Sequence, residues 1–408
     1  MRRRGVIDLP SDADGKATGG RMDGIFTDGL STWLFGGFFL AMGLCVGSFL
    51  NVCIYRLPTG KSLVWPGSHC TSCNTPIAWY DNIPVASYFI LGGRCRKCGA
   101  RFSVRYMLVE LVTGLLWFGY WFAYFRTDLR AGADNIGVYL VHITLVSALL
   151  VSGVIDYERK EIYTSVTNFA LAAGLAGSFI WPEVQQVGAY DWLLPGLTGW
   201  DRTDAVVLGL VGAAVGAGII NITRFLGTLA FRREAMGIGD VYLMAAVGGC
   251  LGWEATVLVF LGAPFLALPY GVWQVLRARR RPQKGSDEEP APPKMCYGTF
   301  LLTVAGFVLL AVAAATARPE WGIAQRLMLL AGLVAFGVSF LFLRKEEEQM
   351  APLEEAPAAE SAAPVMDAHE VPYGPFLGLA AVVVMLVQDY AVTYFQPGVQ
   401  ALWHAVTG

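Results

Sequence analysis

Long apolar blocks separated by short polar segments form the main pattern of this sequence. The blocks fill residues 34–55, 107–125, 136–155, 165–181, 205–222, 241–276, 298–317, 326–343 and 373–390. A helix needs roughly 20 residues to cross a hydrocarbon core of about 30 Å, and the block 241–276 is long enough for a bent pair of helices. The pattern therefore predicts an all-α polytopic membrane protein with about ten transmembrane helices.

Composition and charge agree with this prediction. Hydrophobic residues make up 55% of the 408 residues and charged residues only 15%, whereas soluble proteins carry roughly 25% charged residues. The net charge of -2 gives no indication of a nucleic-acid partner. Twenty of the thirty Lys and Arg residues lie in alternate loops, at 56–106, 157–163, 223–240, 277–297 and 344–372. This bias predicts that these loops face the cytoplasm, although the basic N-terminal tail opposes it.

Changes in composition divide the chain into segments. They are an N-terminal tail (1–32), a first span (33–55), a cytoplasmic tetracysteine domain (56–106), a membrane core (107–276), a linker (277–297), additional spans (298–343), a disordered linker (344–372), and a last span with a C-terminal tail (373–408). Each linker is followed by a similar sequence, which starts with Tyr297-Gly-Thr-Phe after the first linker and with Tyr373-Gly-Pro-Phe after the second. We infer a duplicated unit that adds helical scaffold.

Four of the eight cysteines lie in the tetracysteine domain as two Cys-x-x-Cys pairs. The pairs are Cys70 with Cys73 and Cys95 with Cys98, separated by 21 residues. Four thiolates at such spacing can surround a structural zinc ion, so we predict a small zinc-ribbon-like domain. A redox dithiol remains an alternative, and disulfides are disfavoured in a reducing cytoplasm.

Two aspartates at span ends are the candidate catalytic residues. Asp156 follows an apolar run, and Asp240 stands directly after the glycines Gly237 and Gly239, which would shape an active-site loop. Taken singly, Asp156 could be a solvated helix boundary and Asp240 a helix N-cap. Together they fall at one membrane depth, where two carboxylates can share a proton and activate a water for peptide hydrolysis. The sequence contains no His-Glu-x-x-His or Gly-x-Ser-x-Gly motif that would favour another hydrolytic chemistry.

Several motifs in residues 33–275 resemble one bacterial enzyme family. They are Gly47-Ser-Phe-Leu-Asn-Val-Cys-Ile-Tyr-Arg-Leu-Pro58, the cysteine pairs enclosing Ala78-Trp-Tyr-Asp-Asn-Ile-Pro-Val85, Ser103-Val-Arg-Tyr106, and Glu110. The chain is similar to the type IV prepilin peptidases, which are membrane aspartyl peptidases of the Gly-x-Gly-Asp type. The resemblance assigns the catalytic pair to Asp156 and Asp240, in agreement with the inference from topology.

The resemblance implies a multi-pass enzyme of the bacterial inner membrane with its active site at the cytoplasmic side. Its substrates would be prepilins or pseudopilins of type IV pili or type II secretion, which lose a basic leader, usually after Gly. Members with the tetracysteine domain also methylate the new N-terminal residue with S-adenosylmethionine, but no site for this donor can be derived from the sequence.

Two departures from the family pattern and two alternatives stay open. Tyr163 replaces a proline in the family's Ile-Pro-Asp, and Tyr242 replaces a lysine two residues after Asp240. One alternative is a peptidase that does not methylate. The other is a proton-coupled transporter or zinc-responsive membrane sensor, which would also explain acidic residues in a membrane.

Overall fold

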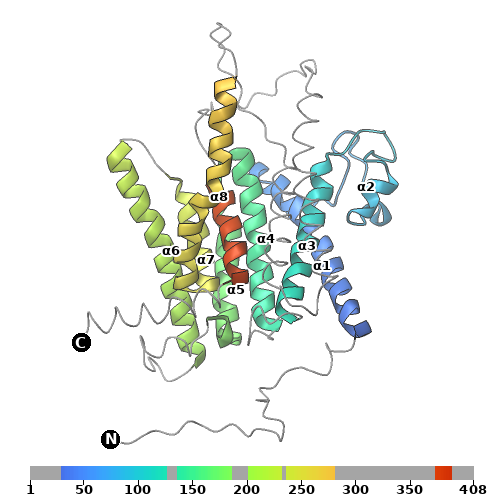
Figure 1. Cartoon of the computed structure of the whole chain (residues 1–408). Coiled ribbons are helices and arrows are strands. Elements are labelled where there is room, and N and C mark those ends of the chain that lie inside the picture. Colours follow the sequence, from blue (N-terminus) through green and yellow to red (C-terminus); the bar gives the residue numbers. More distant parts are fainter. Residues whose placement is uncertain (1–28, 126–135, 186–200, 232–235, 281–372, 388–408) are drawn as a thin grey trace, which may run out of the picture.

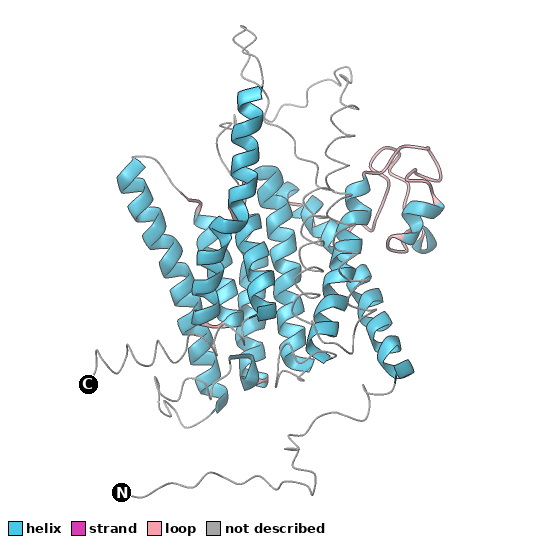
Figure 2. Ribbon diagram, viewed as in Figure 1, coloured by secondary structure: helices cyan, strands magenta, loops and turns pink. Residues whose placement is uncertain are grey.

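The structure is a computed structural model that describes residues 29–125, 136–185, 201–231, 236–280 and 373–387. Within these ranges the chain forms a helical bundle without a sheet (Figures 1 and 2). Its main helices are α1 (Gly29–Arg56), α3 (Val104–Phe125), α4 (Ile136–Arg159), α5 (Thr164–Ile180), α6 (Asp201–Phe231), α7 (Ile238–Leu251), α8 (Trp253–Arg280) and a last helix, Gly374–Val387. The blocks 298–317 and 326–343 lie outside the described residues, as do the linker 344–372 and residues 281–297. Residues 277–280 of the predicted linker 277–297 instead continue α8.

Five of these helices are long and apolar enough to cross a membrane. They are Trp33–Thr59, Val104–Phe125, Ile136–Arg159, Arg202–Ala230 and Trp253–Gly271, and three shorter apolar helices accompany them. Large apolar side chains such as Phe225, Phe265 and Leu229 are mostly exposed on the bundle surface, as expected for a face in contact with lipid. The prediction of an all-α membrane protein is confirmed at this level.

The predicted bent pair in block 241–276 consists of α7 and α8. Gly252, with φ of 81°, ends α7, and α8 begins at the next residue. Glycine reaches this φ at no steric cost, so the chain can reverse direction between the two helices. Helix α7 starts three residues before the predicted block, because Ile238, Gly239 and Asp240 form its first turn.

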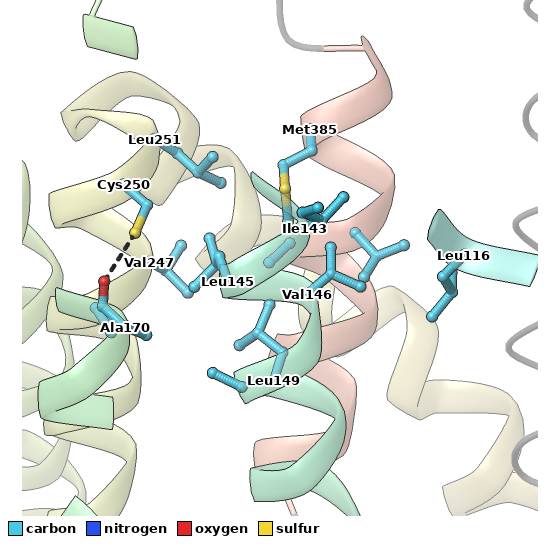
Figure 3. Packing of buried hydrophobic residues seen from close by; sticks show 14 of the residues in the cluster. Leu116, Ile143, Leu145, Val146, Leu149, Ala170, Val247, Cys250, Leu251 and Met385 are labelled. Carbon is cyan, nitrogen blue, oxygen red and sulfur yellow. Dashed lines mark hydrogen bonds between the residues drawn. The ribbon is translucent and has the colours of Figure 1, made fainter. Parts of the chain in front are cut away.

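Helix α4 lies in the middle of the bundle and is its most buried long helix. Side chains from several helices meet around it, and Figure 3 shows part of this core. In this view Ile143 of α4 lies beside Met385 of the last helix, and Leu145 of α4 points toward Val247 of α7. This central position allows α4 to carry a buried polar side chain at its end.

Glycines let α6 and α7 pack backbone against backbone. A Cβ atom added to Gly212 would lie 2.2 Å from the carbonyl oxygen of Gly248, and one added to Gly248 would lie 2.0 Å from that of Gly212. Small residues allow this close approach between membrane helices. The contact fixes α7, and therefore Asp240 in its first turn, against the rest of the bundle.

The last helix, Gly374–Val387, inserts into the same core although a long stretch of chain precedes it. The Tyr120 hydroxyl of α3 donates a buried hydrogen bond of 2.8 Å to the carbonyl oxygen of Val382. Phe376 packs its ring against Tyr270 of α8, with centroids 5.7 Å apart. The helix is shown in red beside α4 in Figure 1. These contacts bring the start of the last helix to the end of α4.

Candidate active site

Asp156 lies in the last turn of α4, directly after the apolar run that buries this helix. Its side chain is only 7% exposed. The backbone N–H of Gly374 donates a hydrogen bond of 3.2 Å to its Oδ2 atom, and Lys160 lies within electrostatic reach. The interpretation of Asp156 as a solvated helix boundary is therefore wrong, because the carboxylate points into the bundle.

Asp240 is the third residue of α7 and is also only 7% exposed. Gly237, with an extended backbone, is the N-cap of this helix, so the interpretation of Asp240 as the N-cap is wrong. A Cβ atom at Gly237 would lie 3.6 Å from Oδ2 of Asp240. Oδ1 of Asp240 is buried and has no hydrogen-bond partner among the described residues.

The structure brings the two aspartates together. Their carboxylates interact electrostatically across the contact between α4 and α7. Ile162, in the loop after α4, packs between the two sides of the site. A Cβ atom on Gly239 would lie 2.7 Å from Cβ of Ile162, and one on Gly374 would lie 3.3 Å from its Cδ1 atom. Because Gly239 and Gly374 have no side chain, Ile162 can occupy the space next to both of them.

Tyr373 and Gly374 complete the site from the last helix. Tyr373 lies within electrostatic reach of Asp240, while Gly374 donates to Asp156. A Cβ atom on Gly374 would lie 2.7 Å from Oδ2 of Asp156. The second of the two similar sequence segments thus packs beside the aspartates, whereas the first, at 297–302, lies outside the described residues. The motif was visible in the sequence, but its place at the site was not.

The two departures from the family pattern lie at the start of α5 and in α7. Tyr163 is the N-cap of α5, with an extended backbone and no side-chain capping bond, and its hydroxyl donates to Glu161 at 3.0 Å. Tyr242 is 40% exposed in the second turn of α7.

The four cysteines of the tetracysteine domain form one cluster. Their Sγ atoms all lie within 4.8 Å of one another, and those of Cys70 and Cys98 are 3.8 Å apart. A tetrahedral zinc ion with Zn–S bonds of about 2.3 Å places its sulfurs about 3.8 Å apart, so the cluster fits zinc. Hydrogen bonding to Thr75 lowers the pKa of Cys73 to about 6, which favours the thiolate that a metal binds.

Two matching turns hold these cysteines. In the first, Asn74 has φ of 52° and its N–H donates to the Cys70 carbonyl at 2.9 Å. In the second, Gly99 has φ of 72° and donates to the Cys95 carbonyl, also at 2.9 Å. Both residue types tolerate a positive φ. The repeated geometry presents both cysteine pairs toward one centre.

Comparison with known protein families places this arrangement in a known context. Residues 41–124 match the family described as "Bacterial Peptidase A24 N-terminal domain", and residues 143–272 match the "Type IV leader peptidase family". The first match covers the tetracysteine domain with its flanking helices, and the second covers both aspartates. The chain belongs to the type IV leader peptidase family. The resemblance found from sequence motifs is confirmed.

Individual relatives agree with the family match. The chain is 33% identical over 356 residues to the prepilin leader peptidase/N-methyltransferase of Myxococcus xanthus (strain DK1622). The aligned region covers 86% of this chain and 90% of the relative. The chain is 34% identical over 229 residues to the protein of the same name from Klebsiella pneumoniae, covering 55% of this chain and 88% of the relative. No solved structure matches the chain.

Proposed function

We propose that this protein is a membrane aspartyl endopeptidase that removes the basic leader of type IV prepilins or pseudopilins, usually after Gly, and N-methylates the new N-terminal residue with S-adenosylmethionine. One observation carries the peptidase proposal: Asp156 and Asp240, 84 residues apart in the sequence, are buried together at one end of the bundle. The names and extent of the relatives support the two reactions.

The buried pair accounts for hydrolysis without a covalent enzyme intermediate. Two buried carboxylates that interact electrostatically retain one proton between them, because like charges disfavour ionisation of both. The ionised aspartate takes a proton from a water molecule while the oxygen of that water attacks the scissile carbonyl carbon. The protonated aspartate donates its proton to the carbonyl oxygen. The tetrahedral intermediate then collapses and the C–N bond breaks. The aspartate that took the proton from water passes it to the leaving amine, and its partner regains a proton from a hydroxyl of the intermediate. The Gly374 N–H holds Asp156 in place during these steps.

In this proposal the enzyme crosses the bacterial inner membrane about ten times and works at the cytoplasmic side. The basic loops support this orientation. The segments at 56–106 and 107–276 serve as the zinc domain and the peptidase core, and the spans after residue 297 add scaffold and deliver Gly374. Zinc, bound by Cys70, Cys73, Cys95 and Cys98, has a structural role, because all four ligands are protein sulfurs.

Conservative replacement of either aspartate tests the peptidase proposal. We expect Asp156→Asn and Asp240→Asn to abolish cleavage of a prepilin in membranes while the protein still accumulates. Asp204→Asn is the matched control, because Asp204 lies near the start of α6, at the opposite end of that helix from the loop to α7. Full cleavage by either active-site variant would contradict the aspartate pair.

The fate of the new N-terminus separates the proposed function from the alternatives. Mass spectrometry of the mature pilin, made with S-adenosylmethionine present, should show one added methyl group. An unmethylated product would leave a peptidase without methyltransferase activity. A transporter or sensor would leave the prepilin uncleaved.

A further inference from the structure

A cavity of about 730 Å³ lies between the tetracysteine domain and the ends of α1 and α3. Its size falls within the range of about 300–1,000 Å³ that is usual for small-molecule sites. The zinc cluster borders it through Cys70, and no step of the peptidase mechanism uses it. Figure 1 shows the tetracysteine domain beside these helix ends.

The lining of the cavity includes polar groups held in fixed positions. Glu110 accepts a hydrogen bond of 2.8 Å from the backbone N–H of Val85, and the Ser48 side chain also bonds to it. Val85 makes this contact with φ of 61°, which is unusual for a β-branched residue. Such backbone strain persists only where the surrounding structure enforces it, and it is common at ligand sites.

Asn51 adds a buried acceptor to the lining of the cavity. Its Nδ2 donates to the Tyr106 carbonyl oxygen at 2.8 Å, which fixes the amide, and the residue is only 5% exposed. Its Oδ1 has no hydrogen-bond partner within the described part of the chain, although Asn51 lines the cavity. A buried polar atom without a partner is costly, so its retention at a cavity indicates a ligand that donates to it.

The walls combine aromatic rings with basic groups. Tyr55, Tyr88 and Tyr106 line the cavity together with Lys61 and Arg101. The Nζ atom of Lys61 lies 5.2 Å from the centre of the Tyr55 ring, so this ring already accepts a cation on its face. The cavity therefore offers aromatic surfaces for a purine, acidic and aromatic groups for a cationic centre, and cations for a carboxylate.

We propose that this cavity binds S-adenosylmethionine, with Glu110 on its cationic part, the Tyr55 ring against its purine and Lys61 or Arg101 on its carboxylate. This proposal rests on the proposed methyltransferase activity and gives it a location. Methyl transfer forms a bond from the neutral N-terminal amine to the methyl carbon while the S–CH3 bond breaks. The sulfur becomes a neutral thioether, and the amine releases one proton to solvent.

An ion pair connects the cavity to the aspartate site. Arg105, in the first turn of α3 beside the cavity residue Tyr106, pairs with Glu158 of α4, two residues after Asp156. Both sites therefore lie at the same end of the bundle. The amine that cleavage releases near Asp156 can reach the methyl donor without crossing the membrane.

Direct binding of S-adenosylmethionine to the purified full-length chain tests the proposal. We expect Glu110→Gln and Tyr55→Ala each to weaken binding by about tenfold or more, the usual range for loss of a charged or stacking contact. Trp79→Ala is the matched control, because Trp79 is an aromatic residue of the same domain, 81% exposed, that does not line the cavity. Zinc content should stay unchanged in all three variants, and the control Trp79→Ala should also keep wild-type prepilin cleavage.

Ultraviolet cross-linking of the wild-type protein with methyl-tritiated S-adenosylmethionine gives a second measurement that needs no substitution. The label should map to peptides from residues 48–110. Label elsewhere, or wild-type affinity in both cavity variants, would overturn this location but leave the methyltransferase activity intact. Absence of any binding by a wild-type sample that cleaves prepilin would overturn the location and the methyltransferase half of the proposed function together.

Discussion

The backbone N–H of Gly374 donates a hydrogen bond to Oδ2 of Asp156 across 218 residues of sequence. This bond joins the last described helix to the end of the central helix α4. A backbone donor cannot rotate away as a side chain can, so the carboxylate keeps one orientation while its partner Asp240 lies on α7. The relationship turns a C-terminal helix into a part of the candidate active site.

Substitution of Gly374 should therefore impair cleavage more than folding. In Gly374→Ala, the added Cβ would lie 2.7 Å from Oδ2 of Asp156 and displace it. We expect the rate of prepilin cleavage to fall by about 100-fold, since a misplacement near 1 Å costs this much. Gly378→Ala, one turn further along the same helix, is the control, because its Cβ would make ordinary contact with Leu149 at 3.6 Å. Equal rates for the two variants would contradict the role of Gly374.

The two glycines before Asp240 should differ in their tolerance of substitution. A Cβ atom on Gly239 would lie 2.7 Å from Cβ of Ile162, which cannot move without its backbone, whereas Gly237 has room. We expect Gly239→Ala to lose most cleavage and Gly237→Ala to keep more than half of it. Kinetic assays on detergent-purified proteins would measure both. A greater loss at Gly237 would show that the loop after α4 does not constrain the site.

Removal of a cysteine ligand should release the metal. Elemental analysis of the wild-type protein should find about one zinc per chain, the number that four thiolates bind in a structural site. Cys70→Ser and Cys98→Ser should lose it, whereas Cys45→Ser, an exposed cysteine of α1 outside the cluster, should retain it. Full zinc content in either ligand variant would refute this tetrad.

The close packing of α6 against α7 should make Gly212 essential for stability. In Gly212→Ala, the new methyl group would lie 2.2 Å from the backbone oxygen of Gly248. Overpacking of this kind costs about 1–3 kcal/mol, so the temperature of unfolding in detergent should fall. Gly218→Ala tests the same change in the same helix where nothing lies within 4 Å. It should unfold at or above the wild-type temperature, because alanine favours helix.

The sequence by itself determined the helical membrane class, the two cysteine pairs and the two candidate aspartates. Long apolar blocks predict helices, because a helix satisfies its backbone hydrogen bonds within the segment when it lies in lipid. The Cys-x-x-Cys pairs can be recognised from the spacing of neighbouring residues alone. Short stretches of sequence also contained the family motifs. The sequence could not distinguish a buried carboxylate from one at a solvated helix end or at a helix cap, because burial depends on neighbours that are distant in sequence.

Only the tertiary structure decided what surrounds Asp156 and Asp240. It placed Asp240 inside the first turn of α7 rather than at the cap, and it brought Tyr373 and Gly374, rather than an unspecified copy of their motif, to the carboxylates. It also enclosed Glu110 and Asn51 in one cavity with the tetracysteine domain. The physical reason is the same in each case: these contacts come from helices that pack side by side, and helix packing is fixed by shape complementarity along whole surfaces rather than by any short sequence motif.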